Sequence, residues 1–112
     1  MRENRQAKRI IRPLNIKFCL SHENPPKWNL TSIIGNISEG GVKFIAPSDL
    51  KDQVLKLEIR SPRLVPRTLK LEAIVLESKP SAHISFYDIR AKFIGLTSDN
   101  KKDLAILEGQ QR

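Results

Sequence analysis

Six segments of this chain are predicted as β-strands, and in four of them hydrophobic and polar residues alternate, a pattern typical of strands with one buried face. The first segment is the clearest, because an apolar side chain recurs at every second position from Leu14 to Leu20. Prolines and short polar stretches separate the segments, and the break before the last one is predicted at residues 78–82, which contain Pro80. The predicted strands cover residues 14–20, 28–34, 42–45, 54–60, 68–76 and 84–94.

The period changes after Gly95, where Leu104 and Leu107 fall on one face of a helix. Ser98, Asp99 and Asn100 are possible N-caps, so we predict a C-terminal helix over about residues 98–108. A helix this short is not stable alone in water and must dock on the strands. Six strands on short turns without intervening helices favour an all-β fold, a six-stranded antiparallel β-barrel, over a βαβ fold.

Length and composition indicate one globular domain. The 112 residues are 39% hydrophobic and 29% charged, which is ordinary for a globular protein. No apolar run approaches the roughly 20 residues that span a bilayer, and the first residues lack the apolar core of a signal peptide. We therefore expect a cytoplasmic protein without a membrane span. The single cysteine, Cys19, excludes an internal disulfide and a cysteine zinc site.

The residues that could perform catalysis do not group into a known arrangement. His22 and His83 lie far apart in sequence without a carboxylate or cysteine at ligand spacing, so neither predicts a metal site. Cys19 is predicted on the face of its strand opposite the apolar row, with no neighbour that would activate a thiol. Trp28 and Tyr87 are interpreted as barrel packing. We expect no catalytic residues, no metal and no enzymatic activity.

Positive charge is concentrated at the N-terminus. The formal net charge is +8, and half of it lies in residues 1–12, where five basic residues are opposed by Glu3 alone. Such an excess indicates a polyanion, a phosphate-bearing ligand or an acidic membrane face as partner. Because this segment has few large apolar residues, we interpret residues 1–12 as a mobile basic arm before a domain at residues 13–112. A solvated tail that only aids solubility is the alternative.

Asn36, Ser38, Gly40 and Gly41 form a turn signal between two predicted strands. The two short polar side chains can hydrogen-bond nearby backbone, and the glycines can adopt the positive φ of a tight reversal. Glycines also leave backbone N–H groups uncovered, where an anion or a flat ring can approach. We therefore expect Gly41 either at positive φ or against a ligand. Most such turns, however, only reverse the chain.

Two spaced motifs carry a resemblance to a known family. Arg5 and Arg9 form an R-x-x-x-R pair, and Asn36, Ser38 and Gly41 complete N-x-S-x-x-G about two dozen residues later. In this order the motifs resemble the signature of the PilZ domain family. The resemblance covers nearly the whole chain and implies a six-stranded antiparallel β-barrel with a C-terminal helix. It also implies a receptor for the bacterial second messenger cyclic di-GMP.

The resemblance implies a role for each signature residue. Arg5 and Arg9 would bind phosphate and stack on guanine, because a guanidinium can do both. Asn36, Ser38 and Gly41 would contact guanine on the barrel. The backbone of the adjacent glycine, Gly40, and the ammonium of Lys8 are further candidate contacts. Cyclic di-GMP would be the ligand, with no other cofactor, and closure of the arm would present a new surface to a downstream protein partner.

Two other functions fit parts of the sequence. A small basic nucleic-acid-binding β-barrel would explain the charge, but aromatic residues are only 5% of the chain and no strand shows paired aromatic residues that could stack on bases. Nucleic acid is therefore the less favoured partner. A PilZ-like protein-interaction module without nucleotide binding is the other alternative, and the presence of all five signature residues argues against it.

Overall fold

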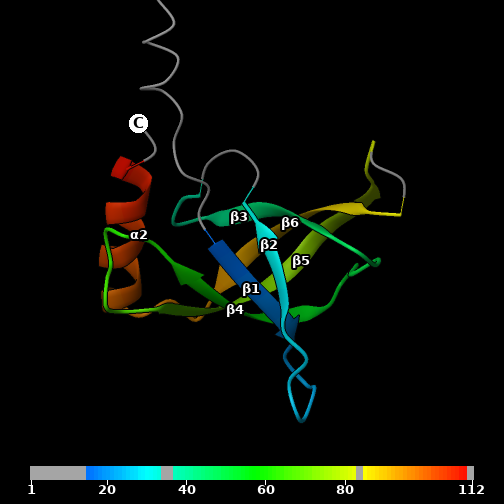
Figure 1. The fold of residues 1–112 in the computed structure, drawn as a ribbon, viewed down its shortest axis with the longest axis horizontal. Helices are drawn as coiled ribbons and strands as arrows, with labels where there is room; N and C mark the ends of the chain where they lie inside the picture. The colour runs from blue at the N-terminus through cyan, green and yellow to red at the C-terminus, as the bar shows by residue number, and fades with distance from the viewer. Residues whose placement is uncertain (1–14, 34–36, 83–84, 111–112) are drawn as a thin grey trace, which may run out of the picture.

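The computed structural model describes residues 15–33, 37–82 and 85–110, which form one curled antiparallel sheet and one helix (Figure 1). The sheet order is β2-β1-β4-β5-β6-β3. The prediction of six antiparallel strands and a C-terminal helix is confirmed. The elements are β1 (Asn15–Leu20), β2 (Asn29–Ser32), β3 (Gly41–Ala46), β4 (Val54–Arg60), β5 (Leu69–Pro80), β6 (Tyr87–Ile94) and α2 (Ser98–Gln110).

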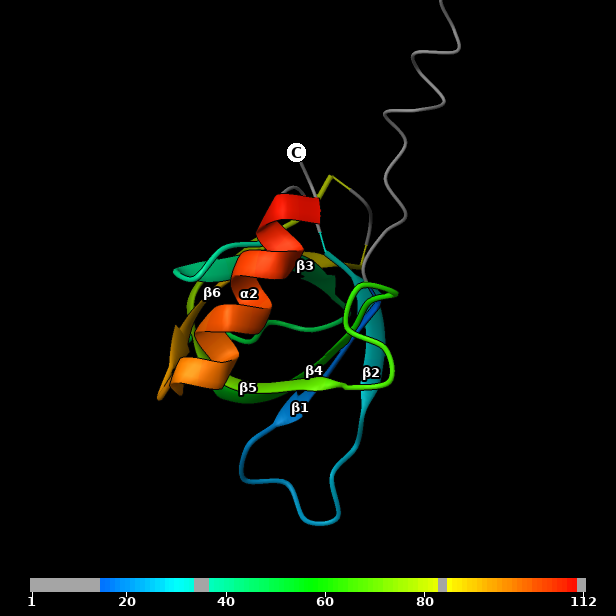
Figure 2. The same ribbon diagram turned by 90° about the vertical axis from the view of Figure 1, so that its left-hand side faces the viewer.

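The two outer strands of the sheet, β2 and β3, curl back toward each other (Figure 2). Ile33 and Phe44 form an isolated antiparallel bridge. The hydroxyl of Thr31 donates a hydrogen bond of 2.8 Å to the carbonyl oxygen of Ile45. These contacts leave less of either edge exposed for pairing with another chain.

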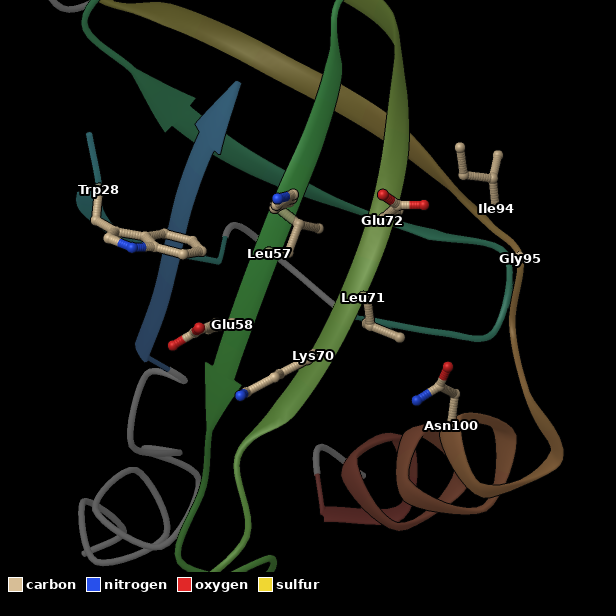
Figure 3. Close-up of a pocket in the computed structure, with 10 residues that line it drawn as sticks. Trp28, Leu57, Glu58, Lys70, Leu71, Glu72, Ile94, Gly95 and Asn100 are labelled. Carbon is tan, nitrogen blue, oxygen red and sulfur yellow. The ribbon is translucent and has the colours of Figure 1, made fainter. Parts of the chain in front are cut away.

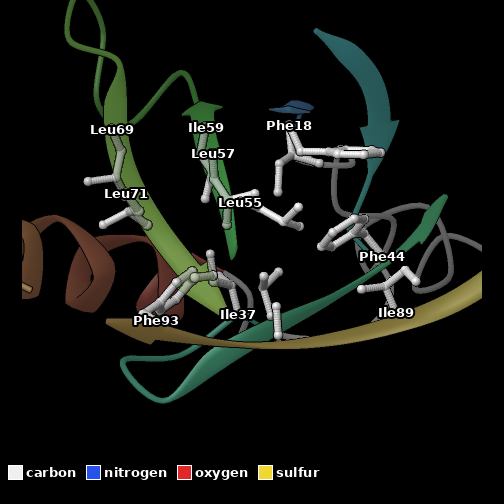
Figure 4. Close-up of a cluster of buried hydrophobic side chains, with 14 of the residues drawn as sticks. Phe18, Ile37, Phe44, Leu55, Leu57, Ile59, Leu69, Leu71, Ile89 and Phe93 are labelled. Atoms are coloured by element: carbon white, nitrogen blue, oxygen red, sulfur yellow. The ribbon is translucent and has the colours of Figure 1, made fainter. Parts of the chain in front are cut away.

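The interior is filled by the apolar rows that the alternation predicts (Figure 4). Phe18 of β1 and Phe44 of β3 are not on neighbouring strands, yet their ring centroids lie 5.1 Å apart with an interplanar angle of 41°. The two rings therefore join opposite sides of the curled sheet. Ile37, Leu50 and Leu64 are also buried, although they lie in connections between strands.

Helix α2 lies across one end of the curled sheet and closes the core (Figure 2). Leu104 and Leu107 are fully buried, as their shared face predicts. The N-cap is Thr97, one residue before the predicted choices. The hydroxyl of Thr97 accepts a hydrogen bond from the backbone N–H of Asn100, and the side chain of Asn100 accepts one from the N–H of Thr97. This reciprocal pair satisfies two backbone donors at the helix start.

The hairpin of β5 and β6 differs from its prediction. Residues 78–80 continue β5, and β6 begins at Tyr87 instead of about residue 84. Pro80 is tolerated because it is the last residue of the strand, where the ladder ends. A β-bulge interrupts the pairing between Val75 and Glu77, so Leu76 is an extra residue on β5.

Three side chains singled out in the sequence have different environments. Tyr87 packs against the core as predicted. Trp28, in contrast, lies outside the core, with the ammonium of Lys17 5.5 Å from its ring centroid. Cys19 is buried, and burial is the main cause that raises the pKa of its thiol, which disfavours the reactive thiolate.

Of the two alternatives predicted for Gly41, positive φ is wrong, and contact with a ligand stays a prediction. Neither Gly40 nor Gly41 has a φ in the left-handed region, whereas Gly95 does, at 62°. A Cβ on Gly41 would instead lie closer than 3.0 Å to the backbone carbonyl oxygen of Ala91 on β6. The first residue of β3 is therefore a glycine because the two backbones approach too closely for a side chain.

This geometry predicts different effects for the two adjacent glycines. Gly41→Ala is expected to reduce the free energy of unfolding by about 1–3 kcal/mol, because the rigid β6 backbone must shift to admit the methyl group. Gly40→Ala is the matched control, since its Cβ would lie 3.7 Å from the Ser38 hydroxyl oxygen, an ordinary contact. We expect the control to be neutral or to stabilise by up to about 1 kcal/mol. Denaturant unfolding measures both, and equal effects would contradict the close-approach explanation.

Candidate ligand-binding site

The turn that leads into β3 is a tight hairpin with its own hydrogen bonds. Ser38 and Gly41 exchange backbone hydrogen bonds of 3.1 and 3.2 Å, which leaves Glu39 and Gly40 as the loop. The hydroxyl of Ser38 also accepts a hydrogen bond of 3.2 Å from the N–H of Gly40. The buried side chain of Ile37 anchors the start of the hairpin in the core. The turn is therefore held in one conformation by contacts on both sides.

Strand β6 places basic side chains directly beside this turn. Gly41 pairs with Lys92, and Lys43 pairs with Arg90 across the β3–β6 ladder. All three cations are exposed. A hollow of about 380 Å³ lies among these residues and the turn. It is lined by Ser38, Gly40, Gly41, Val42, Lys43, Leu76, Arg90, Ala91 and Lys92. This lining, within the described residues, contains three cations and no carboxylate. We call it the turn hollow.

A second hollow of similar size, about 400 Å³, has a different charge. It extends over β4 and β5 from Trp28 to α2 (Figure 3). Lys56 pairs across the ladder with Glu72, and Glu58 pairs with Lys70. Its basic and acidic side chains therefore balance, whereas those lining the turn hollow do not. An anion is attracted to the turn hollow and not to this one.

The guanidinium of Arg90 has a carboxylate partner at the edge of the turn hollow. Its Nε donates a hydrogen bond of 3.3 Å to Oε1 of Glu77 on β5. Lys79 lies 3.8 Å from the same oxygen. The hydrogen bond from Arg90, followed by the charge of Lys79, lowers the pKa of Glu77. Among the described residues, Lys43 and Lys92 form no ion pair.

The structure brings together only part of the predicted site. Ser38, Gly40 and Gly41 all line the turn hollow. The remaining predicted residues, Arg5, Lys8, Arg9 and Asn36, lie outside the described residues.

Sequence reasoning missed the three strand cations, Lys43, Arg90 and Lys92. Alternation indicated that Arg90 and Lys92 face outward. Only the pairing of β3 with β6, which are distant in sequence, shows that they adjoin the turn.

The described part of the chain contains neither a cluster of metal ligands nor a helix that could span a membrane. Its His, Cys, Asp and Glu side chains form no cluster of three that could hold a metal ion. The helix it contains is not long and apolar enough to cross a membrane.

Comparisons with known proteins agree with this fold. The family model of the PilZ domain matches residues 3–108. The solved structure of the inhibitor of motility from Bacillus subtilis superimposes with a TM-score of 0.64 at 17% sequence identity. The alignment covers 90% of this chain but 46% of that protein, so this chain spans about half its length. No curated protein sequence matches. Because the family model matches most of this chain, the chain belongs to the PilZ domain family.

Proposed function

We propose that this chain is a cytoplasmic receptor for cyclic di-GMP and not an enzyme. The observation that carries the proposal is the turn hollow, where the signature residues Ser38 and Gly41, with the adjacent Gly40, adjoin Lys43, Arg90 and Lys92. PilZ domains are binding and receptor modules. A dianion with two guanine bases matches both halves of this surface, because the cations attract its phosphates and the turn offers polar groups at close range.

In this proposal the basic arm supplies the other side of the site. Arg5 and Arg9 bind the phosphates and stack on guanine, with Lys8 as an additional charge. Asn36, Ser38 and Gly41 contact the guanine on the barrel. Closing the arm over the ligand presents a changed surface to a downstream protein partner.

The expected affinity is about micromolar. Each charge-assisted hydrogen bond from the arginines contributes roughly 1.5–3 kcal/mol, and stacking contributes roughly 1–3 kcal/mol per base. Ordering a flexible segment costs roughly 2–5 kcal/mol. With contacts from the turn, the balance is near −8 kcal/mol, which corresponds to about 1 µM and suits a reversible sensor.

One prediction of the proposed function concerns the identity of the ligand. Calorimetric titration is expected to give about micromolar binding of cyclic di-GMP, and at least tenfold weaker binding of cyclic di-AMP and GTP. Adenine lacks the O6 acceptor and the N2 donor of guanine, and GTP lacks the two-phosphate ring. Equal affinity for cyclic di-AMP would instead indicate a general anion-binding surface.

The salt dependence separates this receptor from a nucleic-acid-binding barrel. Binding along a nucleic-acid strand releases many counterions and weakens steeply with salt, whereas a compact dianion neutralises few charges and shows a shallow slope. Tight, steeply salt-dependent binding of mixed-sequence RNA or DNA, without binding of cyclic di-GMP, would overturn the proposed function. Binding of neither ligand would favour a protein-interaction module.

Another prediction concerns the arm. Deleting residues 1–9 is expected to abolish binding and leave the melting temperature nearly unchanged, because the buried residues described begin at Ile16. Arg5→Gln and Arg9→Gln are each expected to weaken binding roughly tenfold or more. Arg2→Gln is the matched control, since it removes the same charge from the same segment outside the signature.

Protection from protease tests whether the arm closes over the ligand. Saturating cyclic di-GMP is expected to slow trypsin cleavage after Arg5 and Arg9. Ligand binding without a change in their cleavage would contradict closure while leaving the receptor function intact.

A further inference from the structure

The strand cations of the turn hollow suggest a second phosphate contact, supplied by the barrel itself. One outer row of side chains runs from Lys43 on β3 through Arg90 on β6 to Glu77 on β5. Arg90 is therefore between a like charge and an opposite charge. Like charges directly opposite on a sheet are destabilising, and the carboxylate of Glu77 offsets this repulsion.

The β-bulge in β5 creates this arrangement. Val75 pairs with Ala91, but the next pair along the ladder is Glu77 with Arg90, so Leu76 is skipped. Without the extra residue, Leu76 would occupy the position opposite Arg90. The bulge thus places a carboxylate beside the guanidinium and leaves Leu76, 39% exposed, lining the hollow as an apolar surface.

The contact between Arg90 and Glu77 is weak enough for a ligand phosphate to replace the carboxylate. Their side chains are 44% and 43% exposed, and pairs this exposed are weak. The hydrogen bond to Glu77 uses Nε of Arg90, and no other hydrogen bond of the guanidinium is found within the described residues. Its terminal amino groups can therefore donate to a phosphate, for which a guanidinium has matching geometry.

We infer that Arg90 is the phosphate-binding residue of the barrel surface, flanked by Lys43 and Lys92, and that Glu77 is an internal competitor which a ligand phosphate displaces. This inference rests on the proposed function, because the phosphate belongs to the same cyclic dinucleotide. Exposed Leu76 provides an apolar contact at the edge of the hollow.

Affinity of an Arg90 variant tests the first half of the inference. Arg90→Gln is expected to weaken cyclic di-GMP binding roughly 10- to 100-fold in calorimetry, the loss of one charge-assisted hydrogen-bonding group. Lys70→Gln is the matched control, because it removes one exposed positive charge from the balanced outer face, opposite Glu58. The control is expected to change affinity less than threefold. Unchanged melting temperatures would show that both variants fold.

Affinity of a Glu77 variant tests the competition. Glu77→Gln is expected to tighten binding about three- to tenfold, because the phosphate no longer displaces a carboxylate from Arg90. Glu72→Gln, which removes a negative charge opposite Lys56, is the control and is expected to change affinity less than twofold. In an Arg90→Gln background the gain from Glu77→Gln should disappear, since the two residues act through one contact.

The possible failures are distinguishable. If the wild-type chain binds no cyclic di-GMP, the proposed function and this inference both fall. If the wild type binds and Arg90→Gln matches Lys70→Gln, the inference is wrong and the receptor function stands. If the gain from Glu77→Gln persists without Arg90, Glu77 acts through general charge and is not a competitor.

The ion pair can also be tested without ligand. Arg90→Gln is expected to raise the pKa of Glu77 toward its ordinary value, because the hydrogen bond from Arg90 is the main cause of its lowering. Lys79→Gln should raise it less, and the charge of Lys43 contributes least. A carboxyl titration followed by NMR measures these shifts, and an unchanged pKa in Arg90→Gln would show that the pair does not form in solution.

Discussion

The close approach of the Gly41 and Ala91 backbones is the contact on which the candidate site depends. Because position 41 has no Cβ, β3 can pair with β6 from its first residue. That pairing places Ser38 and Gly40 beside Arg90 and Lys92, which come from a strand about fifty residues later in the chain. A wider separation between the two strands would move the turn away from the cations and divide the turn hollow.

Charge distribution, more than total charge, distinguishes one face of the barrel from the other. Across β1, β4 and β5 the outward charges alternate in sign, as with Lys17, Glu58 and Lys70. Lys17 and Glu58 form an ion pair of 3.6 Å. Across β3 and β6 the facing residues Lys43 and Arg90 have the same sign, and Lys92 follows one row away. A single carboxylate, that of Glu77, reaches this group from β5 among the described residues.

Local patterns predicted most of the fold, whereas features that depend on contacts between distant strands were not predictable. Alternation located the strands and buried residues such as Phe18, and helical spacing identified Leu104 and Leu107. Alternation missed the bulge at Leu76, because a bulge is defined by the pairing with the partner strand. For Gly41 the sequence predicted positive φ or contact with a ligand, because it does not show that the backbone of Ala91 lies against this residue. Placing Lys43, Arg90 and Lys92 beside the turn likewise requires the β3–β6 register, which the sequence does not show.

The residues of the turn hollow divide into those that the fold requires and those that it does not. Gly41 is needed for strand pairing, so its presence in the signature is expected even in a chain that binds nothing. Ser38 stabilises its own hairpin through the hydrogen bond from Gly40. Lys43 and Arg90, in contrast, face each other as like charges, a repulsion that the exposed carboxylate of Glu77 offsets in the free protein. The strand pairing does not require these two charges, and a phosphate could take the place of that carboxylate, so Lys43 and Arg90 support the receptor function more strongly than the signature glycine does.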